Sequence, residues 1–301
     1  MKTRTFGRTG LQVTPLGLGT AQIGYLGLSQ ADCDRLLGGA LDLGINLIDT
    51  AASYMDSEEK IGRALSARRD RFILSTKCGQ KVDADDPAEW TGKIVRKSAQ
   101  RSLKRLATDH LDILLLHSCP LANLRDGDLI DGLRRCKADG LTRFVGYSGD
   151  NEAAREAANM DVFDCLEMSL NICDQGAIDT ALREAEGKAI LVKRSIANAC
   201  WRDPSEFSPF YESYVQPYVR RLKEMAFTPQ SLGFDGDWGE LALRFTAWQP
   251  GVHCALIGGT NLDHIRANIA AVEKGPLPEP VAEGLRKAWR AHAVTGWAGQ
   301  T

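Results

Sequence analysis

The amino-acid sequence predicts a (β/α)8 barrel, the TIM-barrel fold, in which eight parallel strands alternate with surrounding helices. Short apolar runs bounded by Gly, Asp or Ser recur eight times along the chain. They are too short for independent helices, and their continuous apolar character is typical of strands buried on both faces. Segments with the apolar spacing of amphipathic helices lie between them. Eight such strands over roughly 250 residues fit a closed barrel better than an open, doubly wound sheet.

The predicted strands follow one another along most of the chain. They are residues 15–20, 45–50, 72–77, 111–118, 143–148, 165–171, 189–195 and 254–259. Between the last two lies a long stretch, 196–253, which contains the aromatic and proline-containing WRDPSEFSPFYESYVQPYVRRL. A connection of that length predicts a functional element at the rim of the barrel rather than a linker.

Two of the intervening segments show the helical pattern clearly. Residues 29–44 begin with Ser29 as a candidate cap and repeat apolar residues at Leu36, Leu37, Ala40 and Leu41. Residues 91–109 place Val95, Ala99, Leu103 and Leu106 on one face and basic residues on the other. Strands that alternate with such helices predict βαβ units and a parallel sheet.

An open sheet would bring its own cofactor motif, and the sequence lacks it. GLGTAQIG spaces its glycines as G-x-G-x-x-x-x-G rather than G-x-G-x-x-G, and no G-x-x-x-x-G-K-[ST] occurs. No internal sequence repeat and no second domain are visible. We therefore predict one barrel domain over residues 1–301.

Composition excludes several classes of function. With 44% hydrophobic and 25% charged residues and a formal net charge of -2, the chain has no basic run that suggests nucleic acid or a membrane surface as partner. Its polar start lacks a secretory apolar region, and no apolar stretch approaches the ~20 residues that span a bilayer. These features predict a cytoplasmic protein.

The cysteines and histidines suggest no metal site. The eight cysteines include no C-x-x-C pair, and the five histidines lack metal-binding spacing. We expect the cysteines to be buried small hydrophobes. Cys78 and Cys119 lie close in sequence to the candidate catalytic groups below, but no histidine is assigned to activate a thiol, so a nucleophilic cysteine is disfavoured.

Polar residues stand at the carboxyl ends of the predicted strands, which converge on one face of a parallel barrel. In chain order they are Thr20, Asp49, Lys77, His117, Ser148, Asn171 and Ser195, with Tyr54 just after the second strand. A cap role for Asp49, a rim role for Lys77 and a core role for His117 are each plausible alone. Together with Tyr54 they fit a single mechanism.

That mechanism is carbonyl reduction by hydride transfer. A hydride that reaches a carbonyl carbon leaves an alkoxide, which needs a proton donor within hydrogen-bond reach. A free phenol has a pKa of about 10, and an adjacent ammonium lowers it. We therefore predict that Asp49 orients Lys77, Lys77 lowers the pKa of Tyr54, and Tyr54 donates the proton. His117 orients the substrate and stabilises the developing charge.

Five stretches carry a family resemblance: FGRTGLQVTPLGLGT, GINLIDTAASY, FILSTKCG, SLKRLATDHLDILLLH and GLTRFVGYSG. In order and spacing they resemble successive blocks of the aldo-keto reductases, from about residue 3 to about residue 272. The resemblance implies a (β/α)8 barrel closed at its bottom by an N-terminal β-hairpin, and a nicotinamide cofactor bound without a Rossmann domain. The catalytic tetrad of the family falls on Asp49, Tyr54, Lys77 and His117.

The cofactor contacts that the resemblance implies depart from the family pattern in places. The implied residues are Gly19, Thr20, Asp49, Ser148, Glu167, Arg194, Ser195, Gly258, Thr260, Asn261, His264, Arg266 and Asn268. Gly149 replaces an asparagine, Glu167 replaces a glutamine, and Arg194 replaces a stacking aromatic. Glu167 and Arg194 could instead form a structural ion pair. The resemblance implies NADP(H), the usual cofactor of the family, as the expected one. Basic residues that hold its 2′-phosphate are replaced by Gly259 and Thr260, so NAD(H) stays possible.

Two other functions stay open. The chain could be a nicotinamide-binding regulatory subunit, although no extension for partner binding is visible at either end, or an isomerase or lyase that uses Lys77 as a Schiff-base amine. For the reductase we expect a small carbonyl or alcohol substrate and a monomer or small homo-oligomer. Aromatic residues of the rim segments suit a flat or apolar carbonyl compound; they are Tyr25, Trp201, Phe207, Phe210, Tyr211 and Trp297.

Overall fold

The computed structural model describes residues 1–207, 209–293 and 296–300, and the side chains of Pro204, Pro209 and Phe210 lie outside the described part. Within this part, eight parallel strands close into a barrel in the order β10-β3-β4-β5-β6-β7-β8-β9. The strands are β3 (Leu16–Gly19), β4 (Leu47–Asp49), β5 (Ile73–Cys78), β6 (Leu111–His117), β7 (Thr142–Ser148), β8 (Cys165–Ser169), β9 (Ala189–Lys193) and β10 (Cys254–Ile257). Each overlaps its predicted segment, so the predicted barrel is confirmed.

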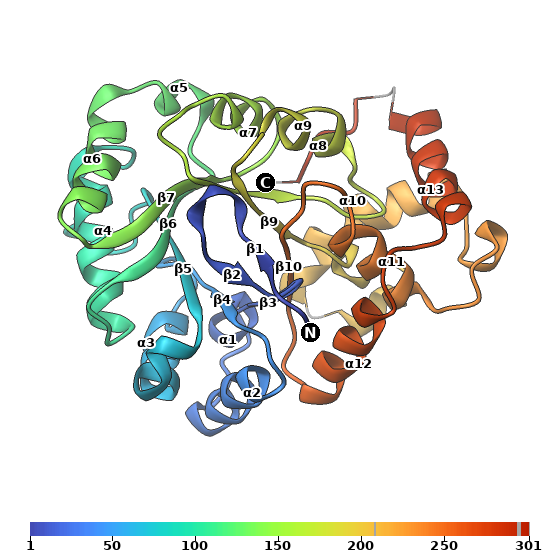
Figure 1. The fold of residues 1–301 in the computed structure, drawn as a ribbon, viewed down its shortest axis with the longest axis horizontal. Coiled ribbons are helices and arrows are strands. Elements are labelled where there is room, and N and C mark those ends of the chain that lie inside the picture. The colour runs from blue at the N-terminus through green and yellow to red at the C-terminus, as the bar shows by residue number, and fades with distance from the viewer. Residues whose placement is uncertain (208, 294–295, 301) are drawn as a thin grey trace.

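Helices surround the strands (Figure 1). They are α1 (Ala21–Tyr25), α2 (Gln30–Asp42), α3 (Ser57–Leu65), α4 (Gly92–Arg105), α5 (Leu121–Leu124), α6 (Gly127–Ala138), α7 (Asn151–Ala158), α8 (Gly176–Asp179), α9 (Ala181–Glu184), α10 (Pro209–Met225), α11 (Trp238–Ala247), α12 (Leu262–Glu273) and α13 (Glu279–His292). The predicted cap of α2 is present, because the Ser29 side chain accepts a hydrogen bond from the backbone N–H of Asp32. The apolar face predicted for α4 is buried at Val95 and Ala99.

A short hairpin closes the amino-terminal end of the barrel. Strands β1 (Arg4–Thr5) and β2 (Gln12–Val13) pair antiparallel, and the dark blue ribbon in Figure 1 shows them against the strand ring. The backbone N–H of Arg8 donates to the carbonyl of Gly187 just before β9, at 2.8 Å. At Gly7 a side chain would clash, since a Cβ atom there would lie 2.4 Å from the backbone nitrogen of Ala189. The opposite end, where the strands finish, is left for a site.

The barrel interior is apolar near the amino-terminal hairpin and polar near the carboxyl ends of the strands. Near the hairpin, Phe6 and Val13 pack with Leu47, Ile113 and Leu191 in one buried cluster. Side chains two residues further along a strand face the same way. Alternation therefore places polar groups directly above this apolar layer, as in the steps from Leu47 to Asp49, from Ile73 to Ser75 and Lys77, from Leu115 to His117 and from Cys165 to Glu167.

The long connection 196–253 contains two helices with different roles. Helix α11 contacts β10 and α12 and so takes the place of an ordinary barrel helix. Helix α10 contacts α13 and residues 197–199, which follow β9. The chain end also returns to this region, because Ser169 and Arg194 both donate to the carbonyl of Gln300, at 2.9 and 2.7 Å. In the described residues no helix is long and apolar enough to cross a membrane.

Candidate active site

A buried ion pair forms the centre of the polar layer. Lys77 Nζ donates to Asp49 Oδ2 at 2.5 Å and to the carbonyl of Thr50 at 3.0 Å. Ser75 Oγ donates to the other carboxylate oxygen of Asp49 at 2.9 Å. Lys77 and Asp49 are 1% and 3% exposed, so the strand partners fix both side chains. Ser75 was not predicted, although it lies two residues before Lys77 and therefore on the same face of β5.

A second carboxylate joins this pair. Glu167 Oε2 lies 3.3 Å from Lys77 Nζ, and Ser148 Oγ donates to Glu167 Oε1 at 3.0 Å. Glu167 is 2% exposed, and its Oε2 is a buried oxygen without a hydrogen bond of good geometry. The predicted alternative, an ion pair between Glu167 and Arg194, is wrong. Glu167 pairs with Lys77, whereas Arg194 lies 3.8 Å from Asp150.

Two buried carboxylates thus face one ammonium, and such a pair takes up a proton near neutral pH. Burial and the charge of Glu167 raise the pKa of Asp49 to about 7. Burial opposes ionisation of Glu167 as well, but the charges of Lys77 and Lys193 hold its pKa below the usual value. Burial alone would lower the pKa of Lys77, yet the charges of Asp49 and Glu167 raise it above its usual value. This disfavours a Schiff base, which needs a free amine.

Tyr54 stands beside this group. Lys77 Nζ lies 5.4 Å from the centroid of the Tyr54 ring. The ring centroids of Tyr25 and Tyr54 are 5.8 Å apart. Burial raises the pKa of Tyr54 to about 12, with smaller upward contributions from Asp49 and Glu167, while Lys77 acts in the opposite direction. The predicted lowering by Lys77 is therefore present, but the expected net decrease in the Tyr54 pKa is wrong because burial outweighs it.

His117 packs against Tyr54. The two rings meet edge to face, with centroids 5.7 Å apart. Burial and the charge of Lys77 hold the pKa of His117 well below its usual value, so the imidazole is neutral. Its Nδ1 lies 3.2 Å from Ser53 Oγ. Ser53 was not predicted, and its position next to Tyr54 in the sequence was the only available signal.

Arg194 and the chain end form a second polar group at the mouth. Besides Gln300, Arg194 binds Ser169 Oγ at 2.6 Å and the hydroxyl of Tyr214. Its guanidinium stacks over the Tyr214 ring, 4.6 Å from the centroid. Asp150, which was not predicted, accepts a hydrogen bond from the backbone N–H of Ser169 at 2.7 Å. Arg194 thus lies at the mouth as expected, but it contacts Tyr214 and the chain end.

Backbone strain collects around the same face. Several non-glycine residues after the strands have positive φ, namely Met55, Ser118, Asn151, Arg194, Ala197, Asn198 and Ala199. Such strain clusters at ligand sites, and successive N–H groups in a run of this kind can form a concavity for anions. The Nδ2 atom of Asn198 is buried without a partner in the described residues. The loop after β9 therefore fits an anionic part of a ligand, whereas the unsatisfied Glu167 oxygen fits a hydrogen-bond donor.

Other predicted contact residues are partly committed to the barrel. Thr20 Oγ1 donates to the carbonyl of Asp49 at 2.8 Å, and Ser195 Oγ donates to the carbonyl of Leu256 at 2.6 Å. Both hydroxyl groups can therefore only accept hydrogen bonds from a ligand. Gly19 lies at the end of β3, paired in register with Asp49.

The predicted loop after β10 is exposed, unlike the centre of the site. Gly258, Thr260, Asn261, His264 and Arg266 are exposed, and Asn268 is half-buried. Asn261 caps α12 by accepting from the N–H of Asp263. Arg266 binds Asp263 on the same helix at 2.7 Å. A cavity of about 540 Å³ beside the loop is lined by Leu28, Asp32, Arg35, Leu36, Thr260, Asn261 and Leu262.

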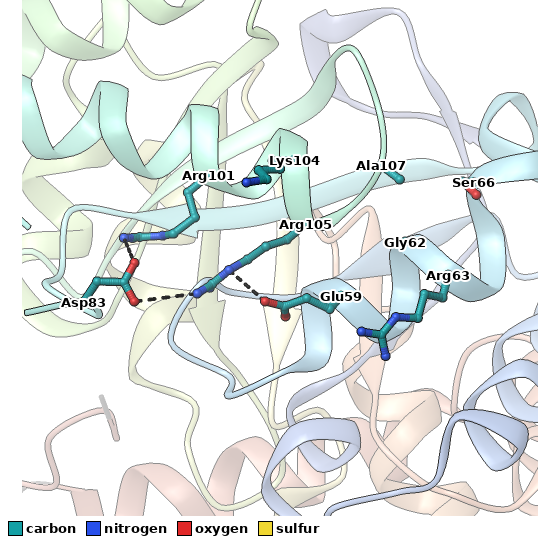
Figure 2. A pocket seen from close by; sticks show the side chains of 9 residues that line it. All are labelled: Glu59, Gly62, Arg63, Ser66, Asp83, Arg101, Lys104, Arg105 and Ala107. Atoms are coloured by element: carbon teal, nitrogen blue, oxygen red, sulfur yellow. Dashed lines mark hydrogen bonds and ion pairs between the residues drawn. The ribbon is translucent and has the colours of Figure 1, made fainter.

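A second cavity lies outside the strand ring and contains none of the predicted site residues. It has a volume of about 630 Å³, and Figure 2 shows the side chains around it. Arg105 binds Glu59 and Arg101 binds Asp83, each at 2.9 Å, so these charged side chains of the cavity wall are paired with one another.

All eight cysteines are buried and free, and burial raises the pKa of the Cys78 thiol.

Fold and site together define a (β/α)8 barrel whose reactive groups stand at the carboxyl ends of the strands. The model of the aldo/keto reductase family matches residues 15–290, so the chain belongs to the aldo-keto reductase family. It is an NAD(P)H-dependent oxidoreductase, as that family and its oxidoreductase relatives support.

Three relatives illustrate this membership. L-galactose dehydrogenase of Arabidopsis thaliana is 26% identical over 296 residues, which cover 89% of this chain and 87% of the relative. NADH-specific methylglyoxal reductase of Escherichia coli is 28% identical over 217 residues, which cover 64% of this chain and 66% of the relative. The solved structure of aldo-keto reductase AKR11C1 from Bacillus halodurans has a TM-score of 0.78 and 24% identity over 96% of both chains. The last comparison supports the fold.

Proposed function

We propose that this protein interconverts a small carbonyl compound and its alcohol, with hydride exchanged with a nicotinamide and a proton exchanged with Tyr54. The observation that carries the proposal is the position of Lys77. Its ammonium is fixed by Asp49 at 2.5 Å and lies 5.4 Å from the Tyr54 ring centroid. An ammonium in that place stabilises phenolate as the proton leaves.

In the direction of reduction, Tyr54 donates its hydroxyl proton to the oxygen that becomes negative. A phenol with its pKa raised to about 12 keeps this proton at neutral pH, and transfers it once an alkoxide, which is a stronger base, forms. The neutral His117 supplies one further N–H. We assign that hydrogen to Nε2, because Ser53 Oγ can donate to Nδ1 at 3.2 Å. Nε2 then orients the carbonyl oxygen.

The nicotinamide supplies or accepts the hydride. We propose that Glu167 and Ser148, which are hydrogen-bonded to each other, contact its carboxamide. We propose the strained loop from Arg194 to Ala199 for its phosphates. Gly19, Thr20 and Ser195 line the same end of the barrel. For the adenosine end we propose Gly258, Thr260, Asn261, His264, Arg266 and Asn268, around the N-terminus of α12.

NADP(H) is the proposed cofactor, and NAD(H) is the alternative. The name of the methylglyoxal reductase states that it is NADH-specific, and the exposed loop after β10 offers only Arg266 and His264 in place of a basic cluster. Tyr25, next to Tyr54, is placed to contact an apolar part of the substrate. Trp201 and Trp297 pack on other rings, Trp238 and Trp289.

Fluorescence titration with NADPH and NADH tests the proposal, followed by turnover with aldehydes, ketones and sugars. We expect micromolar-range binding of one cofactor and transfer of deuterium from cofactor labelled at C4 to the product. Failure to bind either cofactor would overturn the proposal. Tight binding without turnover of any carbonyl or alcohol would favour the regulatory subunit instead.

A further inference from the structure

The centre of the site holds one more carboxylate than its ammonium can neutralise. Lys77 Nζ is shared between Asp49 Oδ2 at 2.5 Å and Glu167 Oε2 at 3.3 Å. The neighbouring imidazole of His117 is neutral, because its pKa is well below the usual value. The phenol of Tyr54 is neutral as well. When both acids are ionised, this group carries a net charge of about -1 in a low-dielectric interior.

The other charged groups of the mouth are three cations that share two carboxylates, so they leave one positive charge over. Lys193 lies 3.2 Å and Arg194 3.8 Å from Asp150, and Arg221 lies 3.7 Å from Asp174. Their positive charges reduce the field of the central group but do not contact Glu167 by an ion pair of the described structure. Glu167 Oε2 also lacks a hydrogen bond of good geometry, so its charge is available to a ligand.

We propose that Glu167 stabilises the positively charged, oxidised nicotinamide over the neutral, reduced form and thereby makes the bound reduced cofactor a stronger hydride donor. The inference rests on the proposed function. In the reaction, the C4–H bond of the reduced ring breaks, its electron pair and hydrogen form a C–H bond at the carbonyl carbon, and Tyr54 protonates the oxygen. The ring gains a positive charge in that step, and a nearby carboxylate lowers the free energy of the charged product.

Proximity follows from the chemistry. Reacting atoms lie about 3–3.5 Å apart, and the carbonyl oxygen must reach the Tyr54 hydroxyl, whose ring lies 5.4 Å from Lys77 Nζ. Glu167 Oε2 lies a further 3.3 Å from that nitrogen, so the Tyr54 ring centroid and this oxygen are no more than about 9 Å apart. For a nicotinamide bound beside Tyr54, we take about 10 Å as the separation between its ring and the carboxylate. At an effective dielectric constant of about 20, a unit charge at that distance changes a binding constant by about tenfold.

Glu167→Gln removes the charge and keeps the shape, and Ser148 can still donate to the retained oxygen. The dissociation constants of NADP+, NADPH, NAD+ and NADH are measured by calorimetry or fluorescence at pH 8.5, above the pKa of about 7 of Asp49. We expect the ratio of oxidised to reduced dissociation constants to rise about tenfold in Glu167→Gln. Glu167→Asp keeps the charge and should stay close to the wild-type ratio.

Glu58→Gln is the matched control. Glu58 is also buried, at 1% exposed, and accepts from Thr76 at 2.7 Å, but it lies in α3 outside the strand ring. Its substitution should leave the ratio unchanged. An unchanged ratio in Glu167→Gln, with both cofactor forms still bound, overturns this inference and leaves the proposed function intact. If the wild type binds neither form, the proposed function itself fails.

Discussion

The buried group at the strand ends and the exposed loop after β10 are both proposed to contact the cofactor, yet they differ in how their charges are held. In the ion pair of the first, the side chains of Lys77 and Asp49 are 0% and 4% exposed. In that of the second, Arg266 and Asp263 are 60% and 80% exposed. Buried charges act through a low dielectric from fixed positions, whereas exposed pairs are screened by water and salt. Substitutions in the first region should therefore have much larger effects.

The largest expected effect is that of Tyr54→Phe. The hydroxyl is assigned only to proton transfer, a contribution of about 10²–10⁴-fold. We expect kcat for carbonyl reduction to fall by that factor while the cofactor dissociation constant stays nearly unchanged. Steady-state kinetics with an aldehyde and a parallel cofactor titration measure both. Tyr25→Phe, which removes a neighbouring hydroxyl, is the control. A kcat near that of the wild type in Tyr54→Phe would exclude this residue as the acid.

Lys77→Met should come next. Lys77 acts to lower the Tyr54 pKa, so its loss raises that pKa further and moves the alkaline limb of the pH–rate profile upward, with kcat reduced. Asp49→Asn should cost less, because Glu167 remains as a second partner of the ammonium at 3.3 Å. The double variant should resemble Lys77→Met alone, since residues that act as a unit are not additive. Additive losses in the pH–rate profiles would argue against the coupling.

Asp49 also links stability to pH. Folding raises its pKa from an unfolded value near 3.8 to about 7, so the folded state retains a proton that the unfolded chain releases. The stabilising contribution is present below about pH 4 and is lost as pH rises through 7, by up to about 1.4 kcal/mol per pH unit in that window. The amide that Asp49→Asn introduces cannot titrate. The free energy of unfolding of Asp49→Asn relative to the wild type, measured with urea, should therefore be higher at pH 8 than at pH 5. The same relative value at both pH values would contradict the raised pKa.

The sequence predicted the barrel because short buried runs and helical spacing are local properties. The strand positions also predicted that Asp49, Lys77 and His117 lie on one face, since the carboxyl ends of parallel strands converge. What it could not predict was the balance of competing terms. The net rise in the Tyr54 pKa depends on how deeply the ring is buried, and the partner of Glu167 depends on register. Ser148 pairs in register with Glu167 across β7 and β8 and donates to its Oε1, while its Oε2 lies 3.3 Å from Lys77.

The contacts made by the chain end were beyond sequence reasoning for a different reason. Gln300 contacts Arg194 across more than a hundred residues of sequence. Arg194 and Ser169 both bind the backbone carbonyl of Gln300 rather than its side chain. No pattern of side-chain types signals such a contact. Ser53 is similar, because its hydroxyl becomes relevant only when the fold places it beside His117.

The smallest expected effect concerns the choice between the two nicotinamides. A 2′-phosphate is favoured by a fixed arginine and by the free N–H groups at a helix N-terminus, and Arg266 lies in the first turns of α12. Asp263 forms an ion pair with Arg266 at 2.7 Å and so competes with a phosphate for the guanidinium.

We therefore expect a modest preference of the wild type for NADPH, which Arg266→Ala reduces by about two- to fivefold, within the range of exposed ion pairs. Asp263→Asn frees the arginine and should raise the preference, and added salt should weaken it. Dissociation constants for NADPH and NADH in each variant, with Lys274→Ala at the far end of α12 as control, measure this ratio. A ratio unchanged by Arg266→Ala would show that another group reads the phosphate. A wild type that prefers NADH would overturn the choice of NADP(H) itself and would leave the proposed role of the buried group unaffected.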